Sequence, residues 1–160
     1  REVLKMAVEL KHSKHSVGQS AYHFVWRPKY NVAVFRNAWC RKVCEQALYD
    51  VAEKHNIKIH EMKVMEDHVH MFVEIPATMD VSKALQLLKG ASARIIFKKC
   101  TRWHRYFSKD GIRKPHLWSP GKFYRSIGCV TSEIVEKYIK FSNKWEFEYL
   151  DKQQRSLSSY

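Results

Sequence analysis

The stretch from Glu66 to Ile75 constrains the fold more than any other part of the chain. Apolar side chains occupy every second position from Val69 onward. Alternation of this kind is typical of a β-strand with one face in the core. The opposite face then carries His68 and His70, roughly 7 Å apart along the strand. Two imidazoles at that spacing can hold one metal ion or be ordinary surface histidines, and the pair alone leaves both interpretations open.

The chain has a large excess of positive charge. It has 160 residues, of which 29 are Lys or Arg and 16 are Asp or Glu, so the formal net charge is +13. This excess predicts a polyanionic partner. Aromatic residues make up 13% of the chain and supply rings that could stack on bases. A basic protein without such a partner is the alternative.

The four cysteines indicate a reduced protein. Cys40 and Cys44 stand one helical turn apart, and no second pair at zinc-site spacing accompanies them. We therefore expect them to be core residues. The sequence shows no signal peptide and no apolar run long enough to cross a membrane. We expect a cytoplasmic protein with free thiols.

Periodicity, capping residues and turn residues predict the order of the elements. Asn37 and Asp80 are helix N-caps, and Trp39 is expected in the buried stripe of the first helix. The predicted elements are strands over 20–30, 57–65, 68–75 and 116–127, helices over 37–55 and 80–99, a basic irregular insertion over 101–114, and a last helix from 131.

This order predicts an α+β protein with a ferredoxin-like, RRM-like βαββαβ antiparallel sheet and an additional C-terminal helix. We expect a basic N-terminal arm over 1–19, one domain over 20–150 and a polar tail over 151–160. If the turn at Glu66 and Asp67 has two residues, Lys63 faces His70. Glu61 then lies diagonal to His70 on the same sheet face.

The last predicted helix carries an apolar stripe at helical spacing: Ile134, Tyr138, Phe141, Trp145 and Tyr149. On this pattern alone Tyr138 is a packing aromatic.

Four motifs together resemble the HUH-superfamily single-tyrosine transposases of small bacterial and archaeal insertion sequences, the IS200 type. They are Tyr-His-Phe-Val-Trp-Arg-Pro-Lys-Tyr over 22–30, Glu-Asp-His-Val-His-Met over 66–71, Leu-Lys-Gly-Ala-Ser-Ala-Arg over 88–94 and Leu-Trp-Ser-Pro over 117–120. The resemblance covers about residues 20 to 145.

The resemblance implies a transposase that cleaves and rejoins single-stranded DNA at the ends of its element. It implies a divalent metal, Mg or Mn, on His68 and His70, and Tyr138 as the nucleophile that forms a 5′-phosphotyrosine. It also implies recognition of DNA hairpins and a homodimer whose active sites are shared between the chains.

The third metal ligand is where the sequence departs from the family. Many members carry Gln or Asn four residues after the tyrosine, where this chain has Ser142. Glu61 is our candidate because a hard metal favours a carboxylate, and Ser142 is the alternative. Asp67 and His23 are expected to orient the imidazoles through their second ring nitrogens.

DNA contacts are expected from basic and aromatic side chains. The phosphate candidates are Lys29, Arg94, Arg102, Arg105 and Arg125. The candidates for stacking on bases are Trp26, Trp103, Tyr106, Trp118 and Tyr124.

Two other functions stay open at this level. An RNA-binding module of the RRM type has a similar sheet, but the third predicted strand lacks that module's glycine and aromatic signature. A domesticated relative that binds hairpins without moving an element is the second. Metal-dependent nicking distinguishes an enzyme from either binder.

Overall fold

A computed structural model describes residues 11–13, 16–18, 20–108, 115–127 and 133. Within these residues no helix is long and apolar enough to cross a membrane. The predicted C-terminal helix, the first ten residues of the arm and Cys129 lie outside the described part, apart from the single helical residue Glu133. The arm also contains a short hairpin that the sequence analysis did not predict, β1 (Lys11–Ser13) paired with β2 (Ser16–Gly18).

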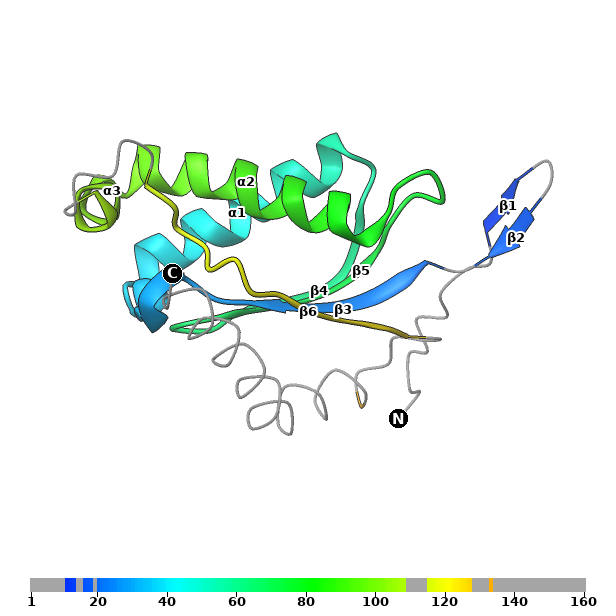
Figure 1. The fold of residues 1–160 in the computed structure, drawn as a ribbon, viewed down its shortest axis with the longest axis horizontal. Coiled ribbons are helices and arrows are strands. Elements are labelled where there is room, and N and C mark those ends of the chain that lie inside the picture. Colours follow the sequence, from blue (N-terminus) through cyan, green and yellow to red (C-terminus); the bar gives the residue numbers. More distant parts are fainter. Residues whose placement is uncertain (1–10, 14–15, 19, 109–114, 128–132, 134–160) are drawn as a thin grey trace, which may run out of the picture.

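Four antiparallel strands form the main sheet (Figure 1). In spatial order they are β4 (Lys58–Val64), β5 (Val69–Glu74), β3 (Ala21–Trp26) and β6 (Phe123–Ser126). The central strands β5 and β3 are flanked by β4 and β6. The last strand, β6, is shorter than the predicted range 116–127. The first part of that range contributes only an isolated bridge between Pro28 and Trp118.

The alternation predicted for β5 is confirmed. Val69, Met71 and Val73 belong to the hydrophobic core, and Lys63 pairs with His70 as expected. The other face was expected to be open, yet His70 is only 1% exposed. The sheet is thus buried on both sides at this strand, which the pattern of a single strand does not reveal.

Two long helices cover the core face of the sheet (Figure 1). α1 (Ala38–Lys54) begins at Asn37, whose side chain accepts the Cys40 N–H at 3.1 Å. α2 (Val81–Lys99) begins at Asp80, whose carboxylate accepts the Lys83 N–H at 2.7 Å. Both predicted N-caps are confirmed, because each side chain satisfies a backbone donor that the first turn leaves without a partner.

The buried stripe of α1 differs from the prediction at its first residue. Trp39 is 62% exposed, whereas Cys40 and Cys44 are buried. Trp39 lies about 100° around the helix from Cys40 and so points away from the stripe. The prediction that Cys40 and Cys44 are core residues is confirmed, and burial raises the pKa of the Cys44 thiol.

The insertion expected to be irregular begins with a helix. α3 (Thr101–Phe107) follows α2 directly, with a bend at Cys100. Phe107 is buried and packs against Phe97, with ring centroids 6.0 Å apart. The prediction of an irregular segment was wrong, because it relied on the dense positive charge of this stretch. No Gly or Pro interrupts the stretch before Gly111, so a helix can form there.

The contrast between Phe35 and Trp39 gives a stability prediction. Phe35 precedes α1 and is fully buried. Phe35→Ala should lower the free energy of unfolding by about 3–5 kcal/mol, because it opens a cavity in the core. Trp39→Ala should change it by less than about 0.5 kcal/mol. Urea denaturation measures both, and a large loss for Trp39→Ala would contradict the packing of α1.

Candidate functional site

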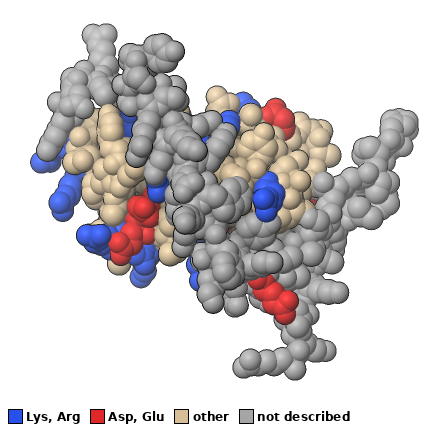
Figure 2. Space-filling model, turned by 60° about the horizontal axis from the view of Figure 1, so that its bottom comes forward, with Lys and Arg blue, Asp and Glu red and all other residues tan. Residues whose placement is uncertain are grey.

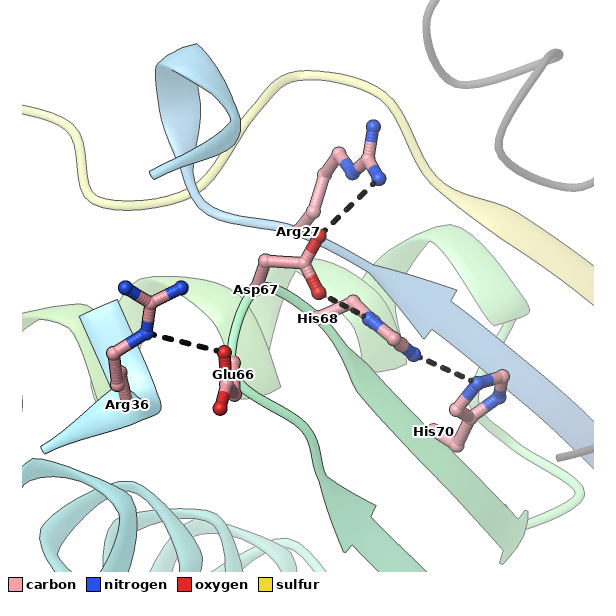
Figure 3. Close-up of polar contacts among 6 residues, drawn as sticks. All are labelled: Arg27, Arg36, Glu66, Asp67, His68 and His70. Atoms are coloured by element: carbon pink, nitrogen blue, oxygen red, sulfur yellow. Dashed lines mark hydrogen bonds and ion pairs between the residues drawn. The ribbon is translucent and has the colours of Figure 1, made fainter. Parts of the chain in front are cut away.

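His68 and His70 turn their Nε2 atoms toward one another. The two atoms lie 3.1 Å apart, at the start of β5 (Figure 3). Adjacent ligands of an octahedral ion with bonds of ~2.1 Å are about 3 Å apart. The two Nε2 atoms therefore fit neighbouring positions around one small divalent metal ion.

A tight turn places His68 at this point. The Met65 N–H donates to the His68 carbonyl at 2.8 Å, which closes the predicted two-residue connection. The turn is held from outside by the segment before α1: the Phe35 N–H donates to the Glu66 carbonyl at 2.9 Å, and the Arg36 guanidinium lies 3.2 Å from the Glu66 carboxylate (Figure 3). The geometry of the pair thus depends on residues distant in sequence.

Asp67 orients the first imidazole. Its carboxylate accepts a hydrogen bond from His68 Nδ1 at 2.7 Å and faces the Arg27 guanidinium at 3.7 Å. The hydrogen bond from His68 lowers the pKa of Asp67 against the opposing effect of burial, and the charges of His68 and Arg27 add to the lowering. An ionised carboxylate only accepts, so His68 holds its proton on Nδ1 and directs Nε2 into the site.

His23 on β3 contacts the second imidazole. Its Nε2 lies 3.0 Å from His70 Nδ1, and its ring stacks on Phe72 with centroids 4.4 Å apart. Asp67 and His23, both predicted to orient the imidazoles, thus each lie within hydrogen-bond distance of one of them.

Burial keeps this second pair of imidazoles uncharged. It lowers the pKa of His23 to about 3, with a further contribution from the Arg125 charge. It also lowers the pKa of His70 to about 3, and protonation of the neighbouring His68 or His23 would oppose a charge on His70 as well. A neutral imidazole is the form that binds metals.

The third ligand has no comparable support. Glu61 pairs with Phe72 and so lies on the predicted face. Within the described residues, however, no three His, Cys, Asp or Glu side chains gather closely enough to hold a metal ion. Ser142 and Tyr138 lie outside the described residues.

The sequence analysis did not predict a buried contact between β4 and β5. His60 Nε2 lies 2.8 Å from a Glu74 carboxylate oxygen, and both side chains are almost fully buried. Regular alternation would direct His60 to the core face. A register shift between Ile59 and Glu61 breaks the alternation, and no residue type at this point of the sequence predicts it.

A groove runs between α2 and the segment before β6. Its volume is about 550 Å³. Lys29 and Arg94, two of the predicted phosphate contacts, line it together with Lys89, His116 and Lys122, which the prediction lacked. The groove therefore gathers cations from three separated parts of the chain.

The other predicted DNA contacts are distributed differently. Arg102 and Arg105 lie on α3, and Arg125 pairs with His23 on β3, away from the groove. Lys and Arg side chains gather toward the left of the view in Figure 2.

Two predicted stacking residues belong to the core instead. Trp26 is fully buried, and Trp118 is 6% exposed and donates its indole N–H to Ser92 Oγ at 3.1 Å. Their rings pack edge to face with centroids 5.9 Å apart. Trp26 therefore offers no exposed surface to a base, and Trp118, although it lines the groove, is almost fully buried.

Lys89 stabilises one wall of the groove by hydrogen bonds to the segment before β6. Its ammonium group donates to the Ser119 carbonyl at 2.8 Å and to the Gly121 carbonyl at 3.2 Å. Burial, aided by the charge of Lys122, lowers its pKa to about 8.

The chain is similar to known transposases. The family model described as "Transposase IS200 like" matches residues 16–142. The transposase for insertion sequence element IS200 of Salmonella typhimurium is 30% identical over 126 residues, 79% of this chain and 78% of that protein. The ISDra2 transposase TnpA of Deinococcus radiodurans is 27% identical over 135 residues, 84% of this chain and 92% of that protein.

Solved structures share the fold. One from Deinococcus radiodurans R1 has a TM-score of 0.63 at 22% identity, covering 82% of this chain and 96% of that chain. A REP-associated tyrosine transposase bound to a REP hairpin has a TM-score of 0.50 at 12% identity, covering 83% of this chain and 70% of that chain.

The lowered pKa of Lys89 predicts a pH dependence of stability. Between about pH 8 and the ordinary lysine pKa near ~10.4, the unfolded chain binds more protons than the folded one. Stability from this group therefore rises with pH across that window. Between pH 8 and pH 10, the free energy of unfolding of wild type should rise by on the order of 2 kcal/mol more than that of Lys89→Met, as measured by urea denaturation. Parallel pH profiles for the two proteins would contradict the burial of this charge.

Proposed function

The chain belongs to the IS200-like transposase family, and on this premise we propose that it cleaves and rejoins single-stranded DNA at the ends of an insertion sequence. Tyr138 is the proposed nucleophile. The observation that carries the proposal is the pair of Nε2 atoms 3.1 Å apart, each imidazole oriented through its other nitrogen by a buried or ionised partner.

The proposed reaction conserves the phosphoester bond. The Tyr138 hydroxyl oxygen attacks phosphorus, the bond from phosphorus to the 3′ oxygen breaks, and the hydroxyl proton is lost while the 3′ oxygen gains one. The products are a 5′-phosphotyrosine and a free 3′-hydroxyl. A 3′-hydroxyl attacking the phosphotyrosine then rejoins a strand without ATP.

The proposed cofactor is Mg or Mn on His68 and His70. When bound, such an ion stabilises negative charge that develops on the scissile phosphate. For both Nε2 atoms to bind it, His70 must hold its proton on Nδ1. The His70 Nδ1–H then donates a hydrogen bond to Nε2 of His23. His23 accepts at Nε2 and therefore carries its own proton on Nδ1. His23 thus sets which nitrogen of His70 is available.

The fold supports the family's arrangement. Spatial order β4-β5-β3-β6, with α1 and α2 on one face, agrees with the ferredoxin-like arrangement predicted from the sequence. In this arrangement the histidines lie on the sheet face opposite the two helices. We propose that the predicted tyrosine helix approaches that histidine face.

The proposed substrate is single-stranded DNA that forms hairpins near the element's ends. A net charge of +13 and the basic groove favour a polyanion. The REP-associated relative with a similar fold is bound to a REP hairpin. We also propose a homodimer in which the tyrosine helix of each chain serves the histidines of the other, an exchange of identical elements between protomers.

A covalent adduct tests the nucleophile. Incubation with Mn and labelled single-stranded DNA from the element's ends should yield a protein–DNA adduct that survives denaturation. Tyr138→Phe should form no adduct, because it lacks the attacking oxygen, yet bind the hairpin normally. Tyr49→Phe, at an exposed tyrosine on α1, is the matched control. An undiminished adduct in Tyr138→Phe would refute the assignment.

The same assay tests the shared site. Tyr138→Phe and the double variant His68→Ala, His70→Ala are each expected to be inactive. Mixed under conditions that allow subunit exchange, they should regain activity, with the adduct only on the histidine-deficient chain. If exchange is demonstrated and no adduct returns, each site is built within one chain.

Metal affinity tests the orienting residues. His23→Phe keeps an aromatic ring but removes the acceptor for His70, so Mn binding measured by calorimetry should weaken by about 10–100-fold. His70→Ala should weaken it further, and His104→Ala, at an exposed histidine on α3, should leave it unchanged. Glu61→Gln tests the third ligand, since a loss equal to that of His70→Ala would make Glu61 a ligand. Unchanged binding in His23→Phe would refute its role.

A further inference from the structure

Tyr30 has a backbone conformation that tyrosine rarely adopts. Its φ is 62° and its ψ is 18°, and the next residue, Asn31, has a φ of 53°. Left-handed geometry is unfavourable for a non-glycine residue and persists where the surroundings impose it. Such conformations concentrate at functional sites, so the placement of this side chain calls for a physical account.

The unusual backbone lays the Tyr30 ring on α3. The ring stacks on Phe107 at 15° with centroids 6.1 Å apart, while Tyr30 as a whole stays 52% exposed. Phe107 is itself fixed, because it is buried against Phe97 and contacts the ring of Tyr106 at 5.2 Å. The exposed Tyr30 ring therefore stacks on a buried ring that belongs to a cluster of packed aromatic side chains.

Positive charge lies beside this ring and along the neighbouring helices. The Lys29 ammonium group lies 5.0 Å from the Tyr30 ring centroid, and Arg102 lies over Trp103 at 5.8 Å. From Val81 to Ser108 the chain has seven Lys or Arg and no Asp or Glu. The combination of exposed aromatic rings and uncompensated cations is typical of surfaces that hold unpaired nucleotides.

The aromatic stack adjoins the groove. Lys29 and Phe97 belong to both, and Arg94 lines the groove one turn of α2 before Phe97. A base on Tyr30 would thus have its own phosphate within the reach of Lys29, with Arg94 further along the groove. Neither feature includes His68 or His70, which lie on the other face of the sheet.

We propose that Tyr30, supported by Phe107, is a stacking site for one unpaired base of the DNA, and that Lys29 and Arg94 bind the adjoining phosphates. This inference rests on the proposed function and adds a contact remote from the reacting phosphate. The occupant is a nucleotide because stacking explains the exposed ring, and a phosphate explains cations for which the described residues provide no ion-pair partner. The strained backbone fixes the ring before binding, which lowers the entropy lost on association.

Two probes separate stacking from charge. One is a fluorescein-labelled dT₁₂ oligonucleotide and the other is the same strand with abasic sites throughout, which keeps the phosphates and lacks the bases. Anisotropy titrations should show that wild type binds dT₁₂ more tightly. Tyr30→Gly should weaken binding to dT₁₂ by about 5- to 100-fold and leave binding to the abasic strand unchanged.

The variants include their own controls. Glycine tolerates a φ of 62°, so Tyr30→Gly should fold, as checked by urea denaturation. Tyr30→Phe should keep wild-type binding, and Tyr49→Gly, at a similarly exposed tyrosine, should keep the wild-type preference for dT₁₂ over the abasic strand. Lys29→Gln and Arg94→Gln should weaken both probes alike and each reduce the salt slope by about 0.7.

The outcomes distinguish this inference from the proposed function. If Tyr30→Gly binds dT₁₂ as wild type does, or if rU₁₂ binds more tightly than dT₁₂, the DNA stacking site is refuted, whatever the Tyr138 adduct shows. If wild type forms no adduct and Tyr30→Gly still loses its preference for dT₁₂, the stacking site stands and the proposed reaction does not.

Discussion

One hydrogen-bonded line within a doubly buried sheet organises the candidate site. It runs from Asp67 through His68 and His70 to His23, across two strands. An imidazole out of water resists protonation, and a buried polar atom requires a partner. Both conditions are met when each imidazole forms a hydrogen bond with the next group in the line. The turn at Glu66, the register of β5 on β3 and the burial of His70 all serve that arrangement.

Much of this arrangement could be predicted from local sequence. Strict alternation gave the two faces of β5, and a two-residue connection gave the pairing of Lys63 with His70, both confirmed. Asn37 and Asp80 predicted where the two helices begin, because their side chains accept hydrogen bonds from specific backbone N–H groups of the first turn. These features depend on residues close in sequence, which is why a single chain reveals them.

The features that the sequence did not reveal depend on tertiary packing. The burial of the histidine face, the exposure of Trp39 and the core position of Trp118 depend on which elements meet, and periodicity does not report that. The helical start of the basic insertion is stabilised by Phe107 against α2. Tyr138 could be singled out only by family resemblance, since its helical spacing is that of an ordinary packing residue.

The register shift at His60 also affects how the molecule meets its neighbours. β4, which carries it, is an outer strand of the four-stranded sheet. A regular outer strand offers a continuous row of amide and carbonyl groups to which a strand from another molecule can add. The irregularity interrupts that row, and Lys58 and Lys63 place charge along it. This side of the sheet is therefore protected against strand addition, and so against aggregation at high protein concentration.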